Sequence, residues 1–110
     1  MTYRVMIEPR AERDIENAAR WVFQESKSRT AALSWVGMIR GEIEALGKNP
    51  RRCPVDPDLE FYGEEVRVLL AGKRQGVYRV LFIIRNEFVH VLTVRHSSRQ
   101  TLQEELDEGE

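Results

Sequence analysis

Residues 77–99, VYRVLFIIRNEFVHVLTVRHSSR, form the stretch that decides the predicted fold. The stretch contains two apolar runs of about nine residues, rich in β-branched side chains and separated by the polar pair Asn86-Glu87. Two such runs joined by a short polar pair are typical of a β-hairpin. Because both alternating sets of side chains in each run are largely apolar, we expect this hairpin to lie inside a sheet that is covered on at least one face.

The register of the hairpin depends on the length of its loop. If Asn86-Glu87 is a two-residue turn, the expected cross-strand pairs are Arg85 with Phe88, Arg79 with Val94, and Tyr78 with Arg95. A loop one residue longer or shorter would move every side chain to the opposite face. The sequence therefore leaves the register open.

Two helices are expected before the hairpin, after a short strand. Residues 2–8 largely alternate apolar and polar side chains, which predicts a strand with one buried face. Pro9 is suited to the first turn of a helix, and apolar residues then recur at helical spacing. Ser28 or Thr30 can cap a second helix, whose apolar stripe ends before Gly47. Because the turn between them is short, the two helices must pack as an antiparallel hairpin.

The segments after the helices complete a small α+β domain. Residues 48–65 contain three of the four prolines and mixed charge, and we expect them to form a loop. Residues 66–71 predict a further strand, and residues 72–76 a basic loop with a glycine at each end. The expected order is β-α-α-β-β-β, an antiparallel sheet packed against an N-terminal helical hairpin. We assign residues 1–103 to this single domain and residues 104–110 to an acidic C-terminal tail.

The composition is that of an ordinary globular chain with one domain. Of its 110 residues 42% are hydrophobic and 32% are charged, and the net charge is −1. No apolar run approaches the ~20 residues that a membrane-spanning helix needs, and the N-terminus lacks the layout of a signal peptide. We therefore expect a cytoplasmic protein with no membrane partner. Cys53 is the one cysteine, which excludes an internal disulfide, and we expect it to be packed in a loop.

Charge is distributed unevenly along the chain. Residues 67–99 carry seven Lys or Arg against one acid, whereas residues 104–110 carry five acids and no base. Basic side chains that alternate with apolar ones on strands must pair with acids or face an anionic ligand. For Arg79, the structural alternative is an ion pair with Glu64 or Glu65. The candidates for target binding are the basic residues Arg67, Lys73, Arg74, Arg79, Arg95 and Arg99, together with His96.

The segment Tyr78-Arg79-Val80-Leu81-Phe82 and the ending Arg95-His96-Ser97-Ser98-Arg99 carry a resemblance to a known family. With the strand, the helical hairpin, the Pro-rich loop and the later strands, they resemble the RelE/ParE superfamily of toxins from type II toxin–antitoxin modules, which includes plasmid-stabilisation proteins. The resemblance covers about residues 3–100. It implies a bacterial toxin of the cytoplasm, neutralised by a small cognate antitoxin that is usually encoded beside it.

Members of this superfamily have two different activities. RelE-like members are endoribonucleases that cut messenger RNA in the ribosome, whereas ParE-like members are similar in fold but poison DNA gyrase through protein contact. RNA cleavage by the 2′-hydroxyl needs a base, an acid and cations beside the phosphate. For a nuclease, the resemblance implies Arg79, Arg95, His96 and Arg99 as catalytic residues, with His96 as acid or base because imidazole titrates near neutral pH.

The C-terminal ending favours a ParE-like toxin. The nuclease members commonly carry a histidine or lysine followed directly by arginine and, some residues later, a tyrosine. Here Ser97 and Ser98 follow His96, and no tyrosine occurs after Tyr78. We therefore expect an inhibitor of DNA gyrase, with a messenger RNA endoribonuclease as the alternative. His96 as a hydrogen-bonded structural histidine stays open.

The remaining polar and aromatic residues predict neither a metal site nor a cofactor. His90 and His96 are six residues apart with no nearby Cys or Asp. Trp21 and Trp35 fall beside the apolar stripes of the helices, where core packing or antitoxin contact is expected. A third alternative is a non-toxic member that only binds its antitoxin and reaches operator DNA through it. An acidic, amphipathic antitoxin segment that folds on binding suits a basic sheet beside an apolar helical hairpin.

Overall fold

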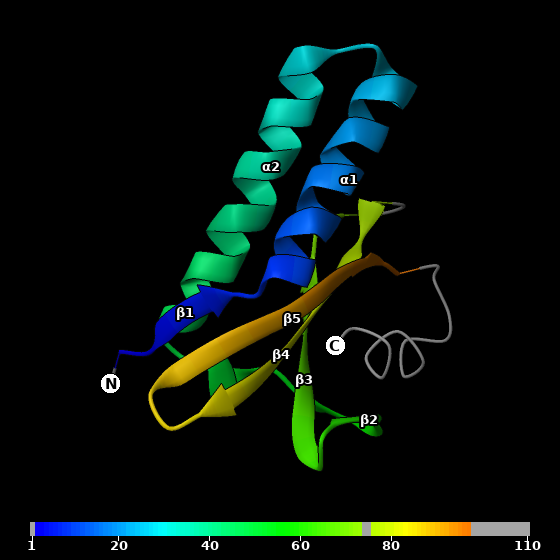
Figure 1. Cartoon of the computed structure of the whole chain (residues 1–110). Coiled ribbons are helices and arrows are strands. Elements are labelled where there is room, and N and C mark those ends of the chain that lie inside the picture. Colours follow the sequence, from blue (N-terminus) through cyan, green and yellow to red (C-terminus); the bar gives the residue numbers. More distant parts are fainter. Residues whose placement is uncertain (1, 74–75, 98–110) are drawn as a thin grey trace.

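A helical hairpin packs on one face of a five-stranded sheet in the computed structural model, which describes residues 2–73 and 76–97 (Figure 1). The predicted α+β architecture is therefore confirmed. The elements in chain order are β1 (Arg4–Ile7), α1 (Pro9–Ser26), α2 (Arg29–Glu44), two short 3-10 turns (Ala45–Gly47 and Pro50–Arg52), β2 (Val55–Phe61), β3 (Glu64–Ala71), β4 (Tyr78–Arg85) and β5 (Phe88–His96).

The sheet is mixed, and the prediction of an antiparallel sheet was wrong for its first strand. The strand order is β1-β5-β4-β3-β2, and β1 pairs with β5 in parallel. All the other neighbours are antiparallel. A parallel pair needs a long crossover connection, and here the connection from β1 to β5 consists of both helices and the rest of the sheet.

The expected loop at residues 48–65 was also wrong, because this segment contains the edge strand β2. The strand includes Pro57, which has no N–H to donate to a ladder. An edge strand tolerates proline because only one of its sides is paired. The pairing of β2 with β3 is correspondingly irregular, with a shift in register between Val55 and Glu60. The sequence predicted a loop because three prolines fall in residues 48–65, although only Pro57 lies within the strand.

The central hairpin is present, with a bulge that changes its register. The predicted pair of Arg85 with Phe88 is confirmed. Further along, Leu81 pairs with Thr93 and Phe82 with Val91, so that Leu92 is an extra residue in β5. The predicted pairs of Arg79 with Val94 and Tyr78 with Arg95 were therefore wrong by one residue. The bulge instead places Arg79 opposite Arg95 and Tyr78 opposite His96.

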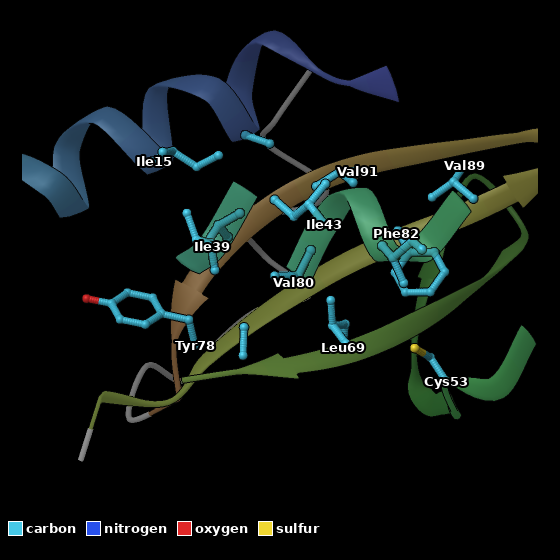
Figure 2. Packing of buried hydrophobic residues seen from close by; sticks show 14 residues of the cluster. Ile15, Ile39, Ile43, Cys53, Leu69, Tyr78, Val80, Phe82, Val89 and Val91 are labelled. Atoms are coloured by element: carbon cyan, nitrogen blue, oxygen red, sulfur yellow. The ribbon is translucent and has the colours of Figure 1, made fainter. Parts of the chain in front are cut away.

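The main core lies between the helical hairpin and the sheet (Figure 2). Fully buried Ile15 of α1 and Ile39 and Ile43 of α2 pack with side chains of β4 and β5 such as Phe82 and Val91. Cys53 is buried in the same cluster, as predicted, and this burial raises the pKa of its thiol. The helices are held on the sheet by this apolar contact.

A second, smaller core covers the opposite face of the sheet. Val66, Leu81, Ile83 and Leu92 are buried there under partly buried side chains that include Phe61 of β2. This explains why both alternating sets of side chains in β4 are apolar, since each set faces a core. Side chains of β2 and β3, among them Leu59, Phe61 and Val68, thus partly cover this face.

The predicted cap of the second helix is confirmed. The Ser28 hydroxyl accepts a hydrogen bond from the backbone N–H of Ala31 at 3.1 Å. The first helix begins at Pro9, also as predicted, and the left-handed conformation of Lys27 (φ 56°) ends it. These local signals define the turn of the helical hairpin.

Replacing Gly72 by alanine is expected to destabilise the protein more than replacing Gly63. Both glycines have positive φ, 98° and 83°, which costs an L residue about 1–2 kcal/mol. At Gly72 an added Cβ would also lie 2.2 Å from the carbonyl oxygen of Gly76, whereas at Gly63 it meets nothing within 4 Å. Urea unfolding of the full chain measures both losses.

Gly41→Ala is the matched control for this comparison. Gly41 lies in α2 with open space around the added Cβ, so the variant is expected to gain up to ~1 kcal/mol from helix propensity. Equal losses for Gly72→Ala and Gly63→Ala would contradict the close approach of Gly76.

Candidate functional site

Three of the predicted site residues gather at one end of the central hairpin. Arg79 of β4 lies opposite Arg95 of β5, and His96 follows directly. Tyr78 lies opposite His96, and the two rings meet edge to face with their centroids 5.1 Å apart. The bulge in β5 therefore sets Arg95 in register with Arg79, with His96 next in the chain. Arg95 and His96 line a groove beside α1, whereas Arg79 lines a separate hollow next to Cys53 and Leu70. Arg74 and Arg99, also predicted, lie outside the described residues.

A row of aromatic rings supports this end of the hairpin. Tyr78 is buried, and its ring also meets Trp35 of α2 at a centroid distance of 5.0 Å. Burial raises the pKa of the Tyr78 phenol above its usual value of 10.0. The phenol is therefore neutral at physiological pH, and it contributes packing rather than charge beside His96.

Asp14 of α1 holds the last part of β5 in place. β1 pairs with β5 only as far as Val91, so the outer edge of β5 has no strand beyond that point. There the Asp14 carboxylate accepts hydrogen bonds from the Thr93 hydroxyl and from the Val94 N–H, the latter at 3.0 Å. Its other oxygen lies 3.9 Å from Nη1 of Arg95. The Asp14 carboxylate thus accepts the hydrogen bonds that the unpaired edge of β5 offers, and it offsets the charge of Arg95.

Asp14 was not among the site residues predicted from the sequence, although its position in the first helix gives a signal. The spacing of Ala11, Asp14 and Ala18 places this acid on the side of α1 that faces the sheet. A carboxylate on a buried face needs donors, because an unpaired buried charge is costly. Only the register of β5 reveals that these donors come from Thr93 and Val94.

A groove runs between α1 and the end of β5. It has a volume of about 470 Å³. It is lined on the helix side by Asp14, Asn17, Ala18 and Trp21, and on the sheet side by Tyr78, Val94, Arg95 and His96. Trp21 is 54% exposed. Of the two tryptophans, Trp35 therefore serves core packing and Trp21 borders an open surface.

Arg67 does not belong to this group. Its Nη1 donates to the carbonyl oxygens of Arg51 at 3.2 Å and Cys53 at 2.7 Å. These bonds fasten the segment before β2 to β3, which is a structural role. Lys73, in contrast, is exposed in the turn that leads from β3 towards β4, at the end of the sheet where Tyr78 lies.

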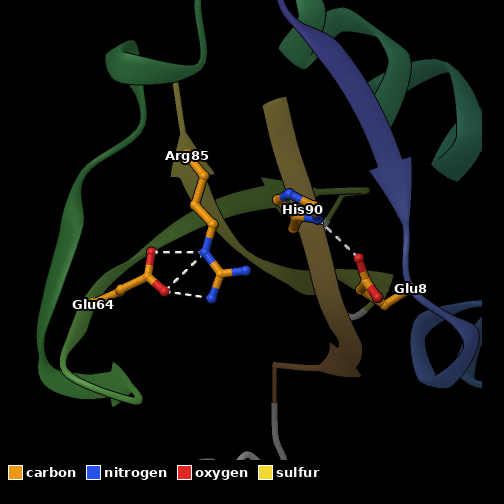
Figure 3. A network of polar contacts seen from close by, with 4 residues as sticks. All are labelled: Glu8, Glu64, Arg85 and His90. Atoms are coloured by element: carbon orange, nitrogen blue, oxygen red, sulfur yellow. Dashed lines mark hydrogen bonds and ion pairs between the residues drawn. The ribbon is translucent and has the colours of Figure 1, made fainter. Parts of the chain in front are cut away.

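The acid expected to neutralise Arg79 is bound to a different arginine (Figure 3). Glu64 forms a forked hydrogen-bonded ion pair with Arg85, whose two donor groups both reach the carboxylate. Within residues 2–73 and 76–97 the Arg79 side chain makes no hydrogen bond or ion pair. The structural alternative for Arg79, an ion pair with Glu64 or Glu65, is therefore not found among the described residues, and the charge of Arg79 is available to a ligand.

A second polar pair lies near Arg85 on the face of the sheet that the helices leave uncovered. His90 Nδ1 of β5 lies 2.9 Å from a carboxylate oxygen of Glu8, as Figure 3 shows. Among the described residues, no group of three His, Cys, Asp or Glu side chains is suited to hold a metal ion. None of the described helices is long and apolar enough to cross a membrane.

Comparison with known proteins assigns the family. The family model described as the ParE toxin of type II toxin–antitoxin system, parDE, matches residues 5–101. The chain belongs to the ParE toxin family. The match includes the central hairpin and both helices, so the resemblance inferred from the sequence is confirmed.

The ParE fold is also found among solved structures, nine chains of which match. One is described as the chromosomal ParDE TA system from P. aeruginosa, with a TM-score of 0.69 and 16% sequence identity. The alignment covers 86% of this chain and 96% of that one. At this identity the likeness concerns the fold alone. No curated protein matches this ParE chain in sequence.

Replacing Asp14 by alanine is expected to cost about 1–3 kcal/mol of folding free energy, because the Thr93 hydroxyl and the Val94 N–H lose their acceptor. Asp14→Asn should lose less, since the amide oxygen still accepts. Urea unfolding gives the loss, and hydrogen exchange of the Val94 amide locates it. Asn17→Ala on the same helix is the control, because Asn17 is exposed and bonds only with exposed Arg20 in the described structure. Similar losses in both alanine variants would contradict the role of Asp14.

Replacing Arg85 by glutamine is expected to destabilise the protein by its full amount above about pH 4.5 and progressively less as the pH falls below that value. The hydrogen bonds from Arg85 hold the pKa of Glu64 below its usual value of 4.5. A lowered folded-state pKa means that the pair stabilises the protein above the unfolded-state pKa and loses this contribution as the pH falls through the folded-state pKa. Both side chains are partly exposed, so the expected loss at pH 7 is about 0.2–1 kcal/mol.

Urea unfolding between about pH 3 and pH 7 checks this dependence, because carboxyl groups titrate within this range. In a Glu64→Gln background the same Arg85→Gln change should have no pH-dependent effect. A loss that persists unchanged at the acid end would show that Arg85 acts through packing instead.

Proposed function

We propose that this chain is the toxin of a type II toxin–antitoxin module, acting in the cytoplasm by inhibiting DNA gyrase and neutralised by a cognate antitoxin. The observation that carries the proposal is the match of the ParE toxin model to residues 5–101. The C-terminal ending supports it, since no tyrosine follows Tyr78. The proposed mode of action is protein contact rather than catalysis.

The geometry of the hairpin end supports a contact surface. Arg79 offers a charge that the described residues leave without an ion pair, and Arg95 and His96 lie beside it. His96 packs its ring against buried Tyr78, and Asp14 uses its carboxylate to bind β5. In the proposed role, Arg79, Arg95 and His96 contact an acidic surface of gyrase, with Lys73 and the predicted residues Arg74 and Arg99 extending the basic area. Arg67, the remaining predicted residue, binds carbonyl groups of the segment before β2 and lies apart from this end of the hairpin.

The proposed antitoxin contact lies on the helical hairpin. Trp21, Phe23 and Leu33 are about half exposed or more on α1 and α2, and exposed apolar side chains of this size are typical of interaction surfaces. An acidic, amphipathic segment that folds on binding would bury such residues and pair with the arginines. Contact with operator DNA is proposed to occur only through the antitoxin.

One observation favours the alternative activity, cleavage of messenger RNA in the ribosome. Arg79 and Arg95 occupy directly paired positions on neighbouring strands, and arginine binds phosphate by charge-assisted hydrogen bonds. In this alternative His96 acts as acid or base. A non-toxic chain that only binds its antitoxin is the remaining outcome.

The test is a brief induction of the chain without antitoxin, in which DNA synthesis and protein synthesis are measured in the same cells. We expect DNA synthesis to stop first, with an induced DNA-damage response while translation continues. An early stop in translation with cleaved transcripts would replace gyrase by the ribosome as the target. No effect on either would leave the antitoxin-binding role alone.

Replacing Arg79 by alanine is expected to weaken growth inhibition about tenfold or more, equal to about 1.4 kcal/mol of binding free energy. Folding should change by less than about 0.5 kcal/mol, because the described structure gives this side chain no bond to lose. Dose–response curves of induction measure the effect, with protein abundance checked in parallel. Arg4→Ala is the control, since Arg4 is exposed beside Phe88 at the other end of β5. Equal inhibition by both variants would remove Arg79 from the target surface.

A further inference from the structure

The groove between α1 and β5 is open where the described part of the chain ends. His96 lines the groove, and Ser97 follows it, donating its N–H to the carbonyl oxygen of Val77 at 2.9 Å. Trp21, which also lines the groove, is 54% exposed. α1 and β5 pack side by side along this line (Figure 1). Whatever follows Ser97 therefore starts at the mouth of an aromatic groove.

The outer side of α1 next to the groove is basic. Helical spacing places Arg13, Asn17 and Arg20 on one side of the helix and Glu12 and Glu16 on another. Glu12 is paired with Arg40 of α2, at 2.7 Å, so the acids face the helical hairpin. Arg20 is exposed and donates only to the neutral Asn17 side chain at 2.9 Å in the described structure. Arg13 and Arg20 thus flank the groove-lining residue Asn17 and attract acidic groups to this side of α1, while the acid that lines the groove, Asp14, is bound to β5.

The sequence after Ser97 has the complementary chemistry. Residues 98–110 contain Leu102 and Leu106, four positions apart, and five acids with no base after position 103. Residues 98–110 lie outside the described structure. The four residues between Ser97 and Leu102 allow a reach of up to ~17 Å, and α1 rises only ~10 Å from Asp14 to Trp21. The segment is long enough to cover the groove.

We propose that residues 98–110 of this chain occupy the groove between α1 and β5. Leu102 and Leu106 cover Trp21 and Ala18, and the acids after position 103 lie along Arg13 and Arg20. The acidic segment is thereby an intramolecular partner of the toxin domain, with a binding role of its own. The proposal does not depend on gyrase or on the ribosome as the target.

Fluorine NMR of the full chain labelled with 5-fluorotryptophan tests this occupancy. The two tryptophans, Trp21 and Trp35, give two resonances, and Trp21→Phe assigns them. In Leu102→Ser/Leu106→Ser we expect the H₂O/D₂O solvent shift of Trp21 to rise about twofold, because a covered indole is returned to water. The Trp35 resonance should stay in place, since Trp35 packs against Tyr78. An unchanged Trp35 resonance also shows that the variant is folded.

Two further measurements separate the contributions of the leucines and of the acids in residues 98–110. Gln100→Ser/Gln103→Ser changes the same segment without removing apolar groups, and should leave both resonances unchanged. High salt should move the Trp21 resonance part of the way towards its position in the leucine variant, because the acid–arginine contacts are screened.

Three results would overturn the proposal. The first is a Trp21 resonance that is as solvent-exposed in the unaltered chain as in the leucine variant. The second is a solvent shift that depends on protein concentration, which would assign the groove to a second copy of this chain. The third is a Trp21 resonance that becomes protected only when antitoxin is added, which would assign the groove to that partner.

Discussion

The carboxylate of Asp14 takes the place of a missing strand beside β5, and the functional end of the sheet depends on it. β1 stops pairing at Val91, while β5 continues to His96. The unpaired N–H of Val94 and the hydroxyl of fully buried Thr93 would otherwise be desolvated without an acceptor. Because α1 supplies that acceptor, helix and strand are fixed relative to each other, and Arg95 and His96 keep their places beside Arg79.

Much of the fold was predictable because local signals agreed with it. The hairpin, the helix start at Pro9 and the Ser28 cap each follow from residues within a few positions of one another. The errors arose where pairing between distant segments decides the structure. Pro57 within β2, after Pro50 and Pro54 just before it, argues for a loop until the strand is known to lie at an edge. No sequence pattern near β1 or β5 indicates that these two strands pair in parallel.

The candidate site shows the same division between local and distant information. Arg79, Arg95 and His96 were predicted from the resemblance to a known family. Their pairing across β4 and β5 depends on one extra residue, Leu92, and the sequence pattern did not predict this bulge. The basic character of Arg67 gave no hint that carbonyl groups of the preceding loop would bind it. Charge counts along a chain therefore overestimate a binding surface, because part of the charge is used inside the fold.

The pairing of β1 with β5 also affects when the fold can form. Arg4 pairs with Phe88, a separation of 84 residues in a chain of 110. Contacts between such distant segments form late, since the loop between them must first be closed. A nascent chain can build its helical hairpin early, but it cannot close the sheet until β5 has left the ribosome. The Arg79–Arg95 surface is consequently one of the last features to appear during synthesis.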